Sequence, residues 1–184
     1  AIKTFTKNIS PKFLEFIYFL ILISLIHTII SFSPSILGEN QPDSNDFLTN
    51  SKTRNFIYLI FYRICEELNF DFLLFQKFLF STSIAMIVFA LKKIEINIYM
   101  RGFFLMGILL NFYFTSFTKI YLAESLFISF INILLSLLLM KNLDRHISYY
   151  FFIGLLIGLV FTIKKIGPVF AICFILFVVF SKLK

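Results

Sequence analysis

Long apolar runs separated by short polar segments dominate the hydrophobicity pattern of this chain. A helix needs about 20 apolar residues to cross a bilayer, and about six runs approach or reach that length. They are Phe13–Phe32, Phe72–Leu91, Ile98–Phe117, Ala123–Met140, Tyr149–Ile163 and Gly167–Phe180. The last two are short and fit either two tilted helices or one broken element. The pattern predicts an all-α, polytopic transmembrane bundle of about six helices, in a single domain over residues 1–184.

Two segments after the first apolar run interrupt this pattern. Ser33–Asn55 is long and polar, and it contains Pro34 and Pro42 together with several acids, which indicates a loop. Phe56–Leu68 mixes apolar residues with three charged ones. It is too short and too charged to cross a bilayer, so we predict an interfacial or re-entrant helix there.

Composition and charge agree with a membrane location. Apolar residues make up 59% of the chain, against about 45–50% in an ordinary soluble domain. The net charge of +7 does not indicate a nucleic-acid partner, because the basic residues lie mostly between apolar runs. The positive-inside rule then predicts a multi-pass protein with a cytoplasmic N-terminus and the loop Ser33–Asn55 on the outer side. Cys65 and Cys173 have no metal-ligand spacing, and we predict neither a disulfide nor a metal site.

Two acidic residues are candidates for chemistry on the outer side. Asp43, in the first loop, is either a general base or cation ligand at the membrane face, or an ordinary solvated acid. Glu124 begins a strongly apolar run. It either faces a cavity or a partner, as ionisable groups at membrane depth usually do, or it is a helix N-terminal acid favoured by the helix dipole.

Basic residues near the end of the chain form a second group of candidates. Lys164 and Lys165 precede Gly167, and they either bind a lipid phosphate or another anion or extend from a helix end to the interface. Arg54 in the outer loop is a weaker anion-binding candidate. Gly154 and Gly158 form a GxxxG pattern, which we expect to serve close helix packing within the molecule rather than a dimer contact.

Several stretches, in their order along the chain, resemble motifs of the GT-C membrane glycosyltransferases. This superfamily uses polyprenyl-phosphate-linked sugars and includes the protein mannosyltransferase and lipid A aminoarabinose transferase groups. The similar stretches are Gln-Pro-Asp43-Ser, Thr53-Arg-Asn-Phe-Ile-Tyr58, Phe75-Gln76-Lys-Phe-Leu, Ala123-Glu124-Ser-Leu-Phe127, and Gly154-Leu-Leu-Ile-Gly158 continuing to Lys164-Lys165-Ile-Gly167.

The chain also departs from the family pattern. Tyr58 follows Arg54 without the family's proline between them, and Lys164 stands where the family has arginine, which replaces a fork-shaped donor by a point charge. Asp43 lacks a clear second acid, since Asp46 is offset. Family members are much longer, so the chain resembles the N-terminal part of such an enzyme, incomplete on its own.

The resemblance implies sugar transfer at the outer face of a bacterial plasma membrane. Asp43 would be the base or orient the acceptor, and Glu124 would shape the substrate pocket. Lys164 would neutralise the departing lipid phosphate. The remaining substrate-binding positions implied by the motifs are Lys165, Asp46, Arg54 and Tyr58. The motifs assign no certain cofactor and leave a divalent cation open. The implied partners are membrane lipids and the lipid-linked sugar donor.

Two other functions fit the same pattern. A transporter or lipid-linked-sugar flippase subunit would place charged groups at mid-membrane depth, and a non-catalytic membrane scaffold would need none of the candidate residues. The glycosyltransferase hypothesis makes a geometric prediction that the others do not: Asp43, Glu124 and Lys164 converge on one outward-facing cavity.

Overall fold

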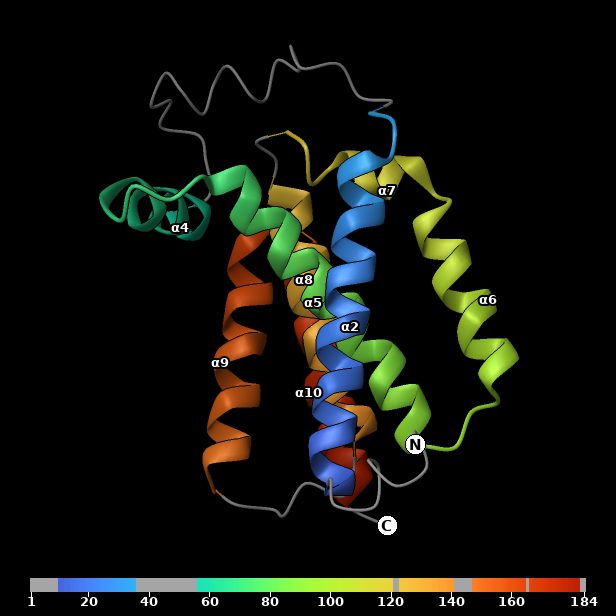
Figure 1. The fold of residues 1–184 in the computed structure, drawn as a ribbon. Coiled ribbons are helices and arrows are strands. Elements are labelled where there is room, and N and C mark those ends of the chain that lie inside the picture. Colours follow the sequence, from blue (N-terminus) through green and yellow to red (C-terminus); the bar gives the residue numbers. More distant parts are fainter. Residues whose placement is uncertain (1–9, 36–55, 121–122, 141–146, 165, 183–184) are drawn as a thin grey trace.

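The computed structural model describes residues 10–35, 56–120, 123–140, 147–164 and 166–182, and every regular element in these ranges is a helix (Figure 1). This confirms the all-α prediction for the described residues. The elements are α2 (Pro11–Phe32), α4 (Phe56–Glu67), α5 (Phe72–Lys93), α6 (Ile98–Leu109), α7 (Phe112–Ser116), α8 (Ala123–Leu139), α9 (Ile147–Ile163) and α10 (Gly167–Lys182).

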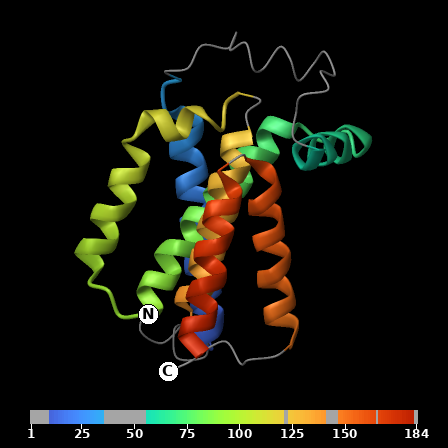
Figure 2. The same cartoon turned by 180° about the vertical axis from the view of Figure 1, so that it is seen from behind.

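Five of these helices, α2, α5, α8, α9 and α10, run side by side (Figures 1 and 2). The helices α2 and α9 run in one direction, and α5, α8 and α10 run in the opposite direction. One end of this bundle contains the last turn of α2 and the first turns of α5, α8 and α10, and we call it the upper end. The opposite end, where α2 begins and α5 ends, is the lower end. The amphipathic helix α4 projects sideways from the upper end, next to the end of α9, while α6 stands at the opposite side of the bundle.

Polar residues just before the helices fix where several of them begin. Ser10 and Asp71 accept hydrogen bonds from the Phe13 and Leu73 amides at 3.2 and 2.8 Å, and so cap α2 and α5. Such side chains satisfy amides that have no partner within the helix. At the other end of α5, the cations Lys92 and Lys93 oppose the negative end of the helix dipole.

Among the described helices, α5 and α8 have the most extensive contact, and they meet along small polar residues. Ser83, Ser129 and Ser136 are completely buried there. Each hydroxyl donates to a carbonyl oxygen of its own helix at 2.7 Å, and Asn132 reaches Ser83 across the interface at 3.4 Å. Small residues allow two helix backbones to approach closely, as is common between helices in lipid.

Much of the outward surface of the bundle is apolar. Large side chains more than half exposed include Ile21 on α2, Phe103 on α6, Phe151 on α9 and Ile172 on α10. Within the described ranges, α2 and α5 are long and apolar enough to cross a membrane, and α6, α8, α9 and α10 contain shorter apolar segments.

The structure corrects the prediction of one helix over Ile98–Phe117. The chain forms α6 and the short α7 instead, with a break at Leu110 and Asn111. Asn111 stands immediately before α7, and its carbonyl accepts from the Thr115 amide at 3.3 Å. Asparagine favours this position because its side chain competes with the helical backbone.

Two other expectations about the final segments are now decided. Residues 147–182 form two antiparallel helices, α9 and α10, rather than one broken element. The expected close packing at the GxxxG pattern within the molecule is wrong. A methyl group added to Gly154 or Gly158 would meet no other atom within 4 Å, because no described helix packs against that face of α9.

Candidate functional site

An ion pair between Glu124 and Lys164 lies at the upper end of the bundle. Glu124 is in the first turn of α8, and Lys164 directly follows α9, 40 residues later in the sequence. The Lys164 ammonium donates a hydrogen bond to Glu124 Oε1. Both side chains are about two-thirds buried, with exposed fractions of 29% for Glu124 and 32% for Lys164. Partial burial reduces solvent screening of the pair and keeps it within reach of a ligand.

The tight turn between α9 and α10 positions Lys164. The Gly167 amide donates to the Lys164 carbonyl at 2.8 Å, so α10 begins only a few residues after α9 ends. A methyl group at Gly167 would overlap the carbonyl oxygens of Val160 and Phe161. Glycine is therefore required by close backbone approach at this turn, which holds the lysine beside the start of α8.

The first turns of α8 form the base of this site. Ser125 and Leu126 are completely buried, and the Phe127 ring contacts the Phe170 ring of α10 edge to face at 5.7 Å between centroids. The Ser125 hydroxyl has no hydrogen-bond partner among the described residues. Buried hydroxyls are usually paired. Ser125, which directly follows Glu124 in the sequence, therefore has a hydroxyl available to donate a hydrogen bond near the ion pair.

Tyr58 lies within the hydrophobic core rather than at the surface of the site. Its side chain is completely buried in α4, and its ring contacts that of Phe72 at 5.0 Å between centroids. The same core cluster contains Leu126 of α8 and Val160 of α9. Tyr58 thus joins α4 to the helices that hold Glu124 and Lys164, and direct substrate contact by Tyr58 stays a prediction.

The other predicted site residues lie outside the described residues. These are Asp43, Asp46 and Arg54 in the first loop, and Lys165 beside the α9–α10 turn. Of the three charged groups predicted to converge, Glu124 and Lys164 are in contact, while the position of Asp43 and the outward-facing cavity stay predictions. Among the described residues, no three His, Cys, Asp or Glu side chains gather as metal ligands.

One charged residue at the upper end was not anticipated from the sequence. Lys119, in the turn before α8, donates to the carbonyl oxygen of Ser33 and reaches that of Ser31 at 3.4 Å. A cation there stabilises the negative end of the α2 dipole. Burial lowers the pKa of Lys119, and the charge of Lys77 lowers it further. The only sequence signal was a lysine between two apolar runs.

Comparison with known proteins adds no relative: no protein-family model matches the chain, and neither the curated proteins nor the solved structures contain a significant match.

Proposed function

We propose that this chain is a multi-pass membrane segment of a GT-C-type glycosyltransferase. In this proposal the N-terminus is cytoplasmic and the upper end of the bundle faces the outer side of a bacterial plasma membrane. The enzyme transfers a sugar from a polyprenyl-phosphate-linked donor to an acceptor at that face.

The apolar outward surface supports the membrane location. Large exposed side chains such as Phe103 and Phe151 lie on helices on different sides of the bundle, and contiguous apolar surface of this extent is rare on soluble monomers. The long helices α2, α5, α6, α8, α9 and α10 alternate in direction in chain order, so each takes the chain from one end of the bundle to the other. The cations Lys92 and Lys93 lie at the lower end, where the positive-inside rule places them in the cytoplasm.

The contact between Glu124 and Lys164 is the observation that most favours sugar transfer. Two motif positions, 40 residues apart, meet at the upper end of the bundle. Ionisable groups at such depth are costly and are usually functional. An ammonium has three donors, so Lys164 can keep its bond to Glu124 and still donate to a phosphate oxygen.

The proposed reaction exchanges two bonds at the anomeric carbon of the sugar. The bond from that carbon to the phosphate oxygen breaks, and its electron pair leaves with the polyprenyl phosphate. A bond from the same carbon to the acceptor oxygen forms, while Asp43 takes the acceptor proton. Lys164 stabilises the charge that develops on the phosphate, and Glu124 orients the ammonium for this task.

A sugar-transfer assay on the gene product that contains this chain tests the proposal. We expect Lys164→Gln and Asp43→Asn each to lower the transfer rate by about 10²-fold or more, the usual effect of losing a charge-stabilising group or a general base. Two variants at the same end of the bundle serve as controls, Lys77→Gln and Glu67→Gln, and should keep wild-type rates. Transfer at wild-type rate by Asp43→Asn and Lys164→Gln would disprove the catalytic roles.

A charge exchange separates a catalytic pair from a structural one. Glu124→Lys combined with Lys164→Glu restores the ion pair and should restore the thermal stability of the protein, but not its activity. Recovery of activity would mean that the pair acts only in folding. Movement of labelled lipid-linked sugar across vesicles, without transfer, would instead favour the transporter or flippase hypothesis.

A further inference from the structure

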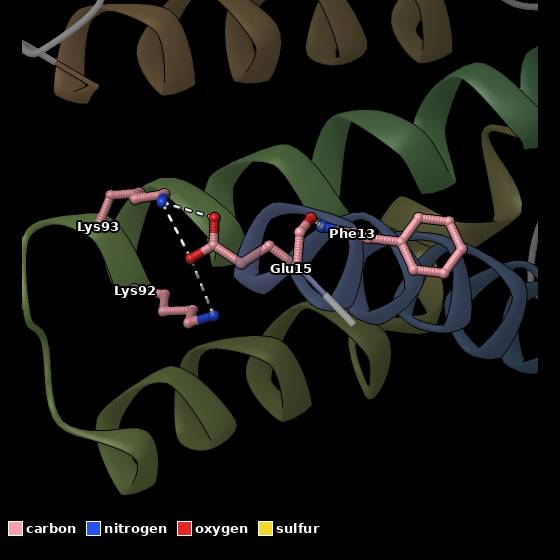
Figure 3. A network of polar contacts seen from close by, with 5 residues as sticks. Phe13, Glu15, Lys92 and Lys93 are labelled. Carbon is pink, nitrogen blue, oxygen red and sulfur yellow. Dashed lines mark hydrogen bonds and ion pairs between the residues drawn. The ribbon is translucent and has the colours of Figure 1, made fainter. Parts of the chain in front are cut away.

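A second charged cluster lies at the lower end, where α2 begins and α5 ends (Figure 3). The Glu15 carboxylate lies between two ammonium groups: Lys93 Nζ is 2.8 and 3.0 Å from its two oxygens, and Lys92 Nζ is 3.6 Å from Oε1. Both lysines are the last residues of α5. One carboxylate therefore forms ion pairs with two ammonium groups.

The cluster has more positive charge than this acid can balance. Lys12 precedes Glu15 by three residues on α2, which places both side chains on the same face of the helix. Lys92 Nζ also lies 5.1 Å from the Tyr18 ring centroid, and Lys93 Nζ lies 5.3 Å from that of Phe89. These cation–π contacts hold the two ammonium groups near one another. Three cations and one carboxylate leave a site that attracts an anion.

An apolar cavity opens beside this cluster. Its volume is about 440 Å³, within the usual range of roughly 300–1,000 Å³ for ligand sites. Lys12 and Glu15 lie on its lining, and the remaining walls are mostly apolar, formed by Phe16, Phe19, Met86, Phe89 and Met140. The buried Thr82 hydroxyl, which also lines the cavity, has no hydrogen-bond partner among the described residues.

We infer that this lower cavity binds an anionic phospholipid. The phosphate of the head group would bind to Lys12, Lys92 and Lys93, and part of an acyl chain would lie against the apolar walls. A free phosphate would leave the cavity unused. The positively charged group of a zwitterionic lipid head would be repelled by the surplus lysine charges. This inference rests on the proposed membrane location of the chain and is independent of sugar transfer.

Lipid binding can be measured directly on the purified gene product that contains this chain, by native mass spectrometry in a neutral detergent. With phosphatidylglycerol and phosphatidylcholine at equal concentration, we expect one phosphatidylglycerol to be retained in preference. The double variant Lys92→Gln/Lys93→Gln should weaken its binding by about 25-fold, from roughly five-fold for each lysine at an anionic lipid surface. Lys77→Gln, on the same helix near the opposite end, is the matched control and should bind as wild type.

Three further variants keep the test decisive if the glutamine variant folds poorly. Lys92→Arg/Lys93→Arg retains the charge and should retain binding. Glu15→Gln should strengthen binding, because it releases both lysines, whereas a purely structural ion pair would give weaker or unchanged binding. Thr82→Phe should fill the cavity and weaken binding without a change in charge.

Several outcomes would overturn the inference. Equal retention of the two lipids would do so, and so would unchanged binding by both the double glutamine variant and Thr82→Phe. Displacement of the lipid by millimolar inorganic phosphate would point to a simple anion site. Because the assay contains no sugar donor, its result is separate from that of the transferase assay.

Discussion

The two ends of the bundle both join a carboxylate to a lysine, but they differ in charge balance and in exposure. At the upper end, Lys164 is the one basic partner of Glu124 among the described residues, and both side chains are about two-thirds buried. At the lower end, Glu15 meets Lys92 and Lys93, and the Lys93 side chain is 44% exposed. The lower pair joins residues 78 positions apart in the sequence, whereas the upper pair joins residues 40 positions apart.

This difference indicates two kinds of site. A partly buried pair of one acid and one base keeps both groups charged and oriented without a net charge. Such a site suits a reaction in which charge develops only in the transition state. A cluster with more cations than anions attracts a ligand with a permanent negative charge, such as a lipid phosphate. In our two proposals, charge balance and burial, more than residue types, separate the two roles.

The largest effect is expected from removing the turn that holds the upper pair. Gly167→Ala should lower the free energy of unfolding by about 1–3 kcal/mol, because its methyl group overlaps backbone carbonyls and forces a shift. Gly158→Ala, which meets open space, should be neutral or stabilising by up to about 1 kcal/mol. Thermal unfolding of both variants in detergent gives the comparison. Similar midpoints for the two would mean that the turn does not fix Lys164.

The upper ion pair should show a moderate coupling energy. In a double-mutant cycle with Glu124→Ala and Lys164→Ala, we expect a coupling of about 1 kcal/mol, at the upper limit for exposed pairs, since the two side chains are mostly buried. Unfolding of the wild type, both single variants and the double variant provides the four measurements. A coupling near zero would argue against a preformed upper site.

The smallest effect is expected for the lower pair. A cycle with Glu15→Ala and Lys93→Ala should give a smaller coupling energy than the upper pair, because these side chains are more exposed and Lys92 stays beside the acid when Lys93 is removed. Raising the salt concentration to about 1 M shortens the screening length to roughly 3 Å and should abolish the coupling. A lower-pair coupling that exceeds the upper one, or that resists salt, would reverse the comparison.

Hydrophobic runs predicted most helices well because burial and chain length act over many residues at once. The run Phe72–Leu91 became α5, with Asp71 as its cap and two lysines at its end. The break at Asn111 was missed because one polar residue barely changes the hydrophobicity of a long run. The GxxxG expectation was wrong because spacing on one helix cannot show whether a neighbour covers that face.

The candidate site was predicted in part. The motif order singled out Glu124 and Lys164, and the structure brings them together. The motif order could not indicate the turn at Gly167, because that turn depends on how closely two backbone segments approach each other. Lys119 was also missed, because its acceptors are backbone carbonyls 86 and 88 residues earlier in the sequence, and any residue type can supply a carbonyl.

The serines between α5 and α8 have a consequence for assembly. Each hydroxyl donates to a carbonyl of its own helix. The hydroxyls are therefore paired in each helix before the two helices come into contact. In lipid, where unpaired polar groups are costly, such helices can insert singly and associate later. Insertion and packing of this pair would then be separate steps, with the Asn132–Ser83 contact formed only in the second.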